Sequence, residues 1–186
     1  MIQIFGHKIN VLSLYLFGAM WAVYLVDFVI PGSLTQFGIQ PRSMSGLTGI
    51  IFSPFLHAGL GHIISNSIPL VVLGILVQLH SKDYFIKITL LGILLSGAFT
   101  WVFSSAGVVV GASGLIFCYW SFLLAYGFFR KDLKSIIIAL VVAVCYFGLI
   151  FGLVSLRSHI SFAGHFGGFL SGVLLAYWLK KDVNSK

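Results

Sequence analysis

The stretch that decides the fold runs from Ile88 to Phe129 and reads ITLLGILLSGAFTWVFSSAGVVVGASGLIFCYWSFLLAYGFF. It holds no Asp, Glu, Lys or Arg. An α-helix needs about 20 mainly apolar residues to cross the hydrocarbon core of a bilayer, so the stretch is long enough for two crossings. Small and polar residues between Ser104 and Gly114 predict the connection between these two helices, and Ser113 lies at the end of that connection.

The rest of the chain is similarly apolar. Of its residues, 59% are hydrophobic and 8% are charged, and the mean hydropathy is +1.08. Lipid cannot satisfy backbone groups, so such a chain must cross the membrane as helices or as a closed barrel. A barrel would alternate apolar and polar residues, whereas the apolar runs here are unbroken. We predict an all-α polytopic membrane protein, one domain over residues 1–186, with six spans at about 11–30, 60–79, 85–104, 112–129, 135–154 and 161–179.

The formal charge of +7 follows the predicted topology. Nine basic residues fall at the chain termini or in the two even-numbered loops, and two fall in the other loops. This positive-inside pattern predicts that both termini face the cytoplasm. The charge therefore reflects orientation in the membrane, and we expect no nucleic-acid partner. The nine are Lys8, Lys82, Lys87, Arg130, Lys131, Lys134, Lys180, Lys181 and Lys186, and the two are Arg42 and Arg157.

Two connections depart from simple turns. The first external connection, about residues 31–59, is long enough to suggest a function, and its apolar second half predicts that it lies partly in the outer leaflet. The connection before the fourth span contains Val108-Val109-Val110 followed by Gly111-Ala112-Ser113-Gly114. Irregular backbone at membrane depth is tolerated where protein buries it or where it lines a wet cavity. Ser113 is therefore expected at a helix N-terminus below the outer surface.

Four polar residues are expected at similar depth. With the N-terminus inside, the second, fourth and sixth spans all run inward from the outer face. His62 and Asn66 lie in the first turns of the second span, Ser113 begins the fourth, and His165 lies one turn into the sixth. Helix N-termini present unpaired N–H groups and partial positive charge, which suits a developing anion. The structural alternative is helix packing for the small residues around Ser113 and interhelical hydrogen bonding for His62 and Asn66.

The chemistry that fits these residues is acyl transfer by a Ser–His dyad. A serine hydroxyl needs a base within hydrogen-bond reach, and His165 can supply it. No acid lies near the outer ends of these spans, because the chain contains no Glu and its one membrane-embedded acid, Asp27, lies in the first span. His62, Asn66, Gly111 and the N–H of Ser113 are the candidate oxyanion donors, whose contribution is usually the largest in acyl transfer.

These motifs resemble the rhomboid family of intramembrane serine proteases, and the resemblance covers nearly the whole chain. Residues 111–114, GASG, are similar to the family's GxSG motif, with Ser113 as nucleophile. Residues 163–168, AGHFGG, followed by Gly172, match the pattern around the catalytic histidine, here His165. Residues 57–62, HAGLGH, with Asn66 four residues on, match the second-helix motif, whose equivalents of His62 and Asn66 help to bind the oxyanion.

The resemblance implies a fold and an activity. The fold is a rhomboid-like six-helix transmembrane bundle in the cell membrane, here a prokaryotic inner membrane. The activity is cleavage of transmembrane segments of membrane proteins near the outer face. The partners are then transmembrane substrates and the lipid bilayer, and no cofactor or metal is needed.

Three further positions are candidates for supporting roles, and the chain departs from the family in two places. His57 opens the second-helix motif, and Gly168 lies on the small-residue face of the sixth span. Phe117, one turn beyond Ser113, stands where several members carry Tyr against the histidine; Phe can stack on the ring but cannot donate a hydroxyl. The first external connection lacks the Trp-Arg pair of many members and has Pro41-Arg42 instead.

Two other functions remain open on these residues. One is a catalytically silent rhomboid-like protein that binds membrane clients, although both Ser113 and His165 are present. The other is a transporter or channel in which His57, His62 and His165 form a proton path or a zinc set, although no Asp or Glu accompanies them as a general base.

Overall fold

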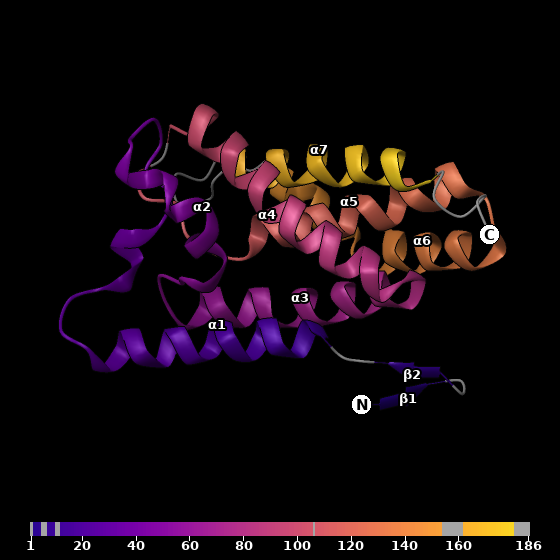
Figure 1. Ribbon diagram of the computed structural model, residues 1–186, viewed down its shortest axis with the longest axis horizontal. Helices are drawn as coiled ribbons and strands as arrows, with labels where there is room; N and C mark the ends of the chain where they lie inside the picture. Colours follow the sequence, from indigo (N-terminus) through magenta and orange to yellow (C-terminus); the bar gives the residue numbers. More distant parts are fainter. Residues whose placement is uncertain (1, 5–6, 10–11, 106, 154–161, 181–186) are drawn as a thin grey trace.

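The computed structural model describes residues 2–4, 7–9, 12–105, 107–153 and 162–180, with side chains from residue 12 onward. Over these residues the chain forms a bundle of long helices that run back and forth along one axis (Figure 1). The predicted all-α polytopic fold is confirmed. The long helices are α1 Leu12–Val29, α3 Leu60–His80, α4 Lys82–Phe103, α5 Ser113–Arg130, α6 Leu133–Cys145 and α7 Phe162–Leu179.

Each of the six predicted spans corresponds to one of these helices, but they differ in apolar length. Among the described residues, α1, α3, α4 and α7 are long and apolar enough to cross a membrane, and α6 joins them if it is counted with the bent segment that follows it. α5 is outside that count because of its composition, since Ser, Tyr, Trp and Arg residues lower the hydropathy of this 18-residue helix. It packs against α3, α4, α6 and α7 and carries polar aromatic residues that protein, not lipid, surrounds. Tyr119 of α5 is fully buried and shares a hydrogen bond of 2.5 Å with Thr89 of α4.

The fifth predicted span, 135–154, is broken where a straight helix was expected. α6 ends at Cys145, and η4 Phe147–Leu153, a 3₁₀ helix, continues at an angle of 67° to it. Residue 154 lies outside the described residues. Seven residues is long for a 3₁₀ helix, and such stretches often mark strain or function. The bend carries η4 back toward the N-terminal end of α7.

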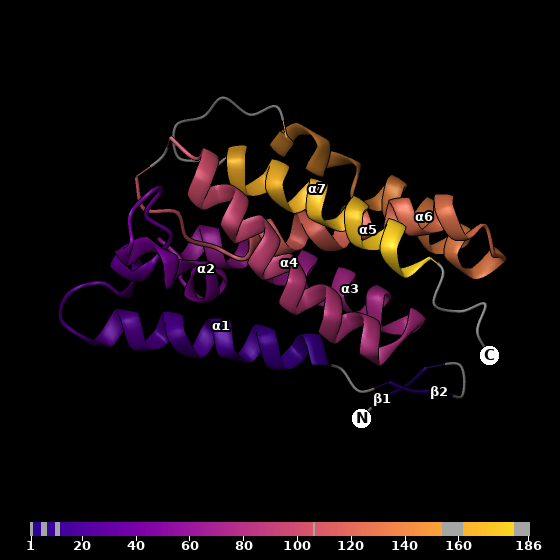
Figure 2. The ribbon, with the colours of Figure 1, turned by 45° about the horizontal axis from the view of Figure 1, so that its top comes forward.

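The first external connection is largely helical, whereas the sequence suggested a loop. It contains η1 Leu34–Phe37, η2 Ser45–Leu47, α2 Gly49–Phe52 and η3 Ser53–Phe55. These short helices lie between α1 and the end of α4 (Figures 1 and 2). Ile50 of α2 packs so closely on Gly97 of α4 that a Cβ at Gly97 would lie 2.7 Å from the Ile50 Cγ2. Ile51 and Phe52 are more than half exposed, as expected for side chains that face lipid.

Hydrogen bonds attach this connection to the segment that leads to Ser113. Ile39 and Val109 exchange two backbone hydrogen bonds of 2.9 and 2.8 Å. The guanidinium of Arg42 donates to the carbonyls of Val102 and Ser104, at 3.0 and 2.8 Å, where α4 ends. Cations and donors at a helix C-terminus satisfy its unpaired carbonyls. The Arg42 side chain therefore ties the connection to the end of α4.

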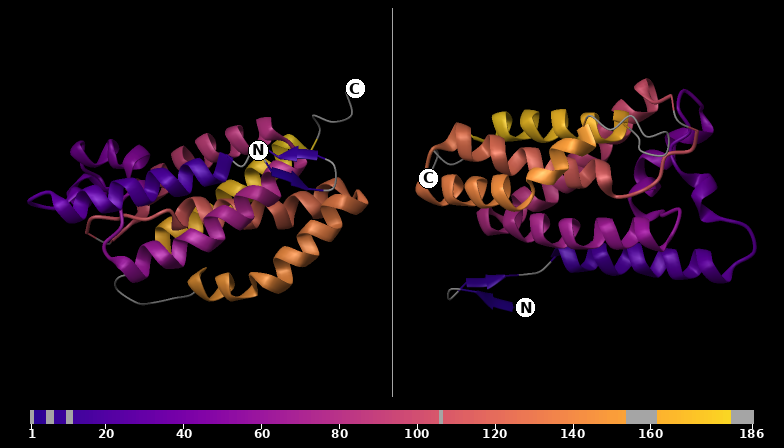
Figure 3. Two further views of the ribbon diagram at one scale, coloured as in Figure 1. Left: turned by 90° about the horizontal axis from the view of Figure 1, so that it is seen from below. Right: turned by 180° about the vertical axis from the view of Figure 1, so that it is seen from behind.

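The N-terminal region contains a feature that the sequence did not indicate. A two-stranded antiparallel hairpin, β1 Ile2–Ile4 and β2 His7–Ile9, precedes α1. Viewed from below and from behind, α1 lies along α3, and α6 lies beside α5 at the other side of the bundle (Figure 3). Arg157 and His159, together with residues 11, 161, 181 and 186, lie outside the described residues.

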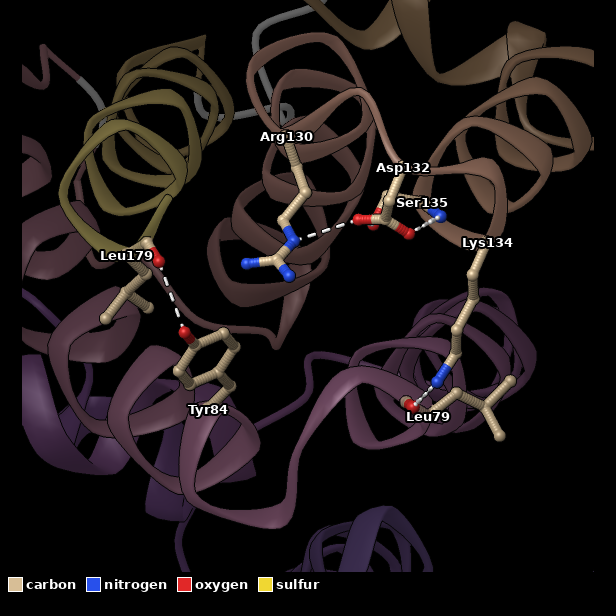
Figure 4. A network of polar contacts seen from close by, with 7 residues as sticks. All are labelled: Leu79, Tyr84, Arg130, Asp132, Lys134, Ser135 and Leu179. Atoms are coloured by element: carbon tan, nitrogen blue, oxygen red, sulfur yellow. Dashed lines mark hydrogen bonds and ion pairs between the residues drawn. The ribbon is translucent and has the colours of Figure 1, made fainter. Parts of the chain in front are cut away.

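Polar contacts join several helices at the end of the bundle away from Ser113 (Figure 4). Asp132 caps α6 by accepting from the backbone N–H of Ser135, and it forms an ion pair of 2.9 Å with Arg130. Burial disfavours ionisation of Asp132, but the bonds from Ser135 and Arg130 outweigh it and lower the pKa of the carboxyl group. Tyr84 and Lys134 donate to the last carbonyls of α7 and α3, at Leu179 and Leu79. Helix ends from across the bundle are thus tied together here.

Candidate active site

Ser113 is the first residue of α5. The preceding Gly111 has a φ of +113°, a conformation that residues with a side chain rarely adopt, and Ala112 forms the N-cap without a side-chain bond. The first N–H groups of a helix have no intrahelical acceptor and carry partial positive charge. The hydroxyl of Ser113 therefore lies at a helix end suited to an anion.

His165 lies in the first turn of α7 and is held from two sides. Its Nδ1 lies 2.9 Å from the backbone carbonyl oxygen of Gly152 in η4. Its ring stacks on Phe117 of α5, with centroids 4.3 Å apart and planes 15° apart. Because a carbonyl only accepts hydrogen bonds, Nδ1 must carry the proton, so in the neutral ring the lone pair is on Nε2.

Glycines allow α7 to press against the start of α5. A Cβ at Gly168 would overlap the carbonyl of Gly114, and a Cβ at Gly114 would lie 3.4 Å from the carbonyl of Gly164. The residues next to Ser113 and next to His165 are therefore in contact. The first turns of α5 and α7 lie at the same end of the bundle (Figure 1). Within the described ranges no hydrogen bond joins the Ser113 hydroxyl to His165. Catalytic hydrogen bonds are often loose in the absence of substrate.

His62 of α3 lies against the turn before Ser113. A Cβ at Gly111 would lie 2.6 Å from the Nε2 of His62, so only glycine leaves room for this ring. Asn66, which is buried, donates from its side-chain nitrogen to the backbone carbonyl of His62 at 2.8 Å. An amide nitrogen has two hydrogens, so this bond uses one and leaves the other for a second acceptor.

The backbone N–H of Gly111 is already paired. It donates to the carbonyl of Ser53 in η3 at 2.8 Å. Its expected role as an oxyanion donor stays a prediction, and this bond argues against it. What Gly111 provides here is the positive φ and the space for His62.

His57 is buried behind this group. It is 2% exposed, and its ring centroid lies 4.9 Å from that of His62. Across the described ranges, no group of three or more His, Cys, Asp or Glu side chains is placed to hold a metal ion. The geometry therefore makes His57 a packing neighbour of His62.

The carbonyl of Gly152 is the one site element that sequence reasoning missed. It occupies the position that an acid takes in a triad, on the Nδ1 side of the histidine. No side-chain pattern could reveal a backbone acceptor, and the only signal is a glycine in the apolar run from Phe147 to Leu153.

Substituting Gly152 by alanine tests this contact. A Cβ at Gly152 would lie 2.7 Å from the tip of the Phe117 ring and 3.3 Å from the Nδ1 of His165. We expect Gly152→Ala to displace the histidine and to lower the rate of Ser113-dependent chemistry by about 100-fold, the loss typical of a misplaced catalytic group. Gly148→Ala in the same helix is the matched control, because its Cβ would meet nothing within 4 Å. Equal rates for the two variants would show that the Gly152 contact has no role in catalysis.

Comparison with known proteins gives the family of the chain. Residues 44–182 match the Rhomboid domain family. The uncharacterized proteins Mb1372 of Mycobacterium bovis and Rv1337 of Mycobacterium tuberculosis are each 37% identical over 169 residues, covering 86% of this chain and 70% of theirs. RHOMBOID-like protein 1 of Arabidopsis thaliana is 31% identical over 130 residues, covering 66% of this chain and 32% of the plant protein. This chain is therefore a multi-pass membrane protein that belongs to the rhomboid family.

Proposed function

We propose that this protein is an intramembrane serine endopeptidase in which Ser113 is the nucleophile and His165 the general base. The single observation that carries the proposal is the placement of His165. Its Nδ1 donates to Gly152, its ring lies flat on Phe117 one turn beyond Ser113, and its Nε2 makes no hydrogen bond within the described ranges. A histidine fixed in this tautomer can accept the Ser113 proton through Nε2.

The proposed reaction is an acyl transfer that passes through an acyl-enzyme on Ser113. The Ser113 oxygen attacks the scissile carbonyl as His165 takes its proton, and the protonated His165 then donates to the leaving amide nitrogen. Water adds to the acyl-enzyme in the second half of the cycle, with His165 again as base. The carbonyl of Gly152 holds the ring, as an acid would in a triad, but without a charge to stabilise the imidazolium.

The oxyanion site in this proposal combines the first N–H of α5 with His62 and Asn66. The position of His62 against Gly111 supports this role, as does the second hydrogen of the Asn66 amide. The helix N-terminus of α5 adds partial positive charge at the same place.

The proposed substrates are transmembrane segments of membrane proteins. The chain would lie with both termini in the cytoplasm, as the excess of basic residues at that end supports. Ser113 would then be reached from the outer face, where water enters. A substrate helix must unwind locally to reach it, which favours Gly or Pro near the cut.

Reconstitution tests the function and the oxyanion role together. Wild-type protein in vesicles is expected to cleave a single-span substrate, and Asn66→Ala should lower kcat by about 10²–10³-fold with little change in KM. Ser65→Ala is a matched control, because exposed Ser65 also donates to the His62 carbonyl, at 2.8 Å. It should keep kcat within about twofold, the usual neutrality of surface changes.

Two results would contradict these expectations. If wild-type protein binds the substrate without cutting it, the function is client binding. If Asn66→Ala loses thermal stability but keeps its kcat per folded molecule, Asn66 is a structural residue of α3.

A further inference from the structure

The C-terminal end of α7, at the end of the bundle away from Ser113, carries aromatic and basic residues on its exposed side. The Lys180 ammonium lies 3.7 Å from the centroid of the Tyr177 ring and 5.1 Å from that of Phe129 in α5. The two rings are in turn 5.8 Å apart and nearly perpendicular. Lys180 is thus held in one place, although long lysine side chains are otherwise mobile on surfaces.

A stripe of exposed, mainly apolar side chains runs along α7 toward its C-terminus and ends at this lysine. Leu170 is 42% exposed and Leu174 is 39% exposed, and they are followed by Tyr177 and Trp178 at 51% and 56%. The spacing places these residues on one side of α7. The opposite side carries Gly164, Gly168 and Gly172 and is buried against α5. The stripe therefore faces the lipid, with the aromatic pair where interfacial Trp and Tyr are usually found.

Lys180 forms no ion pair with the residues that the structure describes. Over the described residues the one ion pair is Arg130 with Asp132, and no carboxylate lies within ion-pair distance of Lys180. Lys131, which follows Arg130 in a left-handed conformation, is exposed and makes no ion pair within the described residues. An anion at this place would meet the ammonium of Lys180, which pairs with none of the described carboxylates.

We propose that this aromatic–basic surface, formed by Phe129, Tyr177, Trp178 and Lys180, binds the head group of an anionic phospholipid. The acyl chains lie along the stripe from Leu170 to Leu174, and the phosphate contacts Lys180. Charge and shape together select this partner, because a free anion has no acyl chains to lie along the stripe and a zwitterionic head group has no net negative charge to attract Lys180. The inference does not depend on the proposed protease activity.

Fluorescence quenching by brominated lipid tests the site, because Trp178 lies within it. Protein is reconstituted in phosphatidylcholine vesicles, and brominated phosphatidylglycerol or brominated phosphatidylcholine is added in increasing amounts. The Trp178 signal is the difference between wild type and Trp178→Phe. One basic side chain at a membrane surface contributes enough for about a fivefold preference for anionic lipid. We therefore expect brominated phosphatidylglycerol to quench half of the Trp178 signal at about one fifth of the mole fraction that brominated phosphatidylcholine requires.

Single substitutions distinguish binding at Lys180 from attraction of anionic lipid by the overall positive charge of the protein. Lys180→Gln should abolish the preference and Lys180→Arg should keep it. Lys82→Gln, an exposed lysine at the same end, should leave it unchanged. The proposal is overturned if wild type shows no preference, or if Lys82→Gln and Lys180→Gln reduce it equally. It is also overturned if inorganic phosphate at constant ionic strength displaces the brominated lipid, because the anion alone would then explain binding. Thermal midpoints in detergent verify that each variant is folded.

Discussion

Alanine at position 113 is expected to abolish cleavage of a transmembrane substrate, with a loss on the order of 10⁶-fold in kcat, the scale found when a serine nucleophile is removed. Ser113→Ala removes only the side-chain hydroxyl group. It makes no hydrogen bond within the described part of the chain, so folding should be unaffected. The measurement is single-turnover cleavage in vesicles, together with thermal unfolding of the same preparation.

The control for this variant is Ser105→Ala, which changes an exposed serine in the connection that precedes α5. It should cleave at the wild-type rate. If Ser113→Ala retains cleavage, the nucleophile has been wrongly assigned. If both variants lose activity, the connection as a whole, and not the Ser113 hydroxyl, is what catalysis requires.

Alanine at position 168 should have the second largest effect, through packing. The added Cβ would overlap the backbone carbonyl of Gly114, and a carbonyl in the first turn of α5 cannot move without moving Ser113. Forcing extra atoms into a packed interior typically costs 1–3 kcal/mol. We expect a lower thermal midpoint and, in the protein that stays folded, at least a 100-fold loss of turnover from displacement of the reacting groups.

Gly18→Ala in α1 is the matched control, because nothing lies within 4 Å of its Cβ. Alanine is the better helix former by about 1 kcal/mol, so this variant should be as stable as wild type or more so. Unchanged stability and turnover in Gly168→Ala would mean that α5 and α7 do not depend on this close contact.

The helices were predictable because the bilayer constrains them. Unbroken apolar runs of about 20 residues have one structural solution in lipid, and each such run proved helical. Gly164, Gly168 and Gly172 are spaced by four, which places them on one face of α7, and this small-residue face packs against α5. What hydropathy could not show is that α5 is enclosed by protein, since enclosure depends on the arrangement of the other helices.

The parts that could not be predicted are determined by contacts far apart in the chain. The break after Cys145 has no proline to mark it, and the resulting bend brings Gly152 to His165, thirteen residues later. The short helices between Leu34 and Phe55 are stabilised by Gly97 and by carbonyls at the end of α4, which local patterns do not reveal. Family resemblance alone indicated that Phe117 can stack on the histidine, and in the structure the two rings are stacked.

The most direct measurement of the central claim is mass spectrometry of the protein after reaction with a fluorophosphonate. The expected result is one adduct on Ser113 in wild type, and at least a 100-fold slower reaction in His165→Ala, because the hydroxyl loses its base. Gly148→Ala should be labelled at the wild-type rate, since its Cβ touches nothing. An adduct elsewhere, or equal labelling of Ser113 with and without His165, would contradict the assignment of Ser113 as a nucleophile activated by His165.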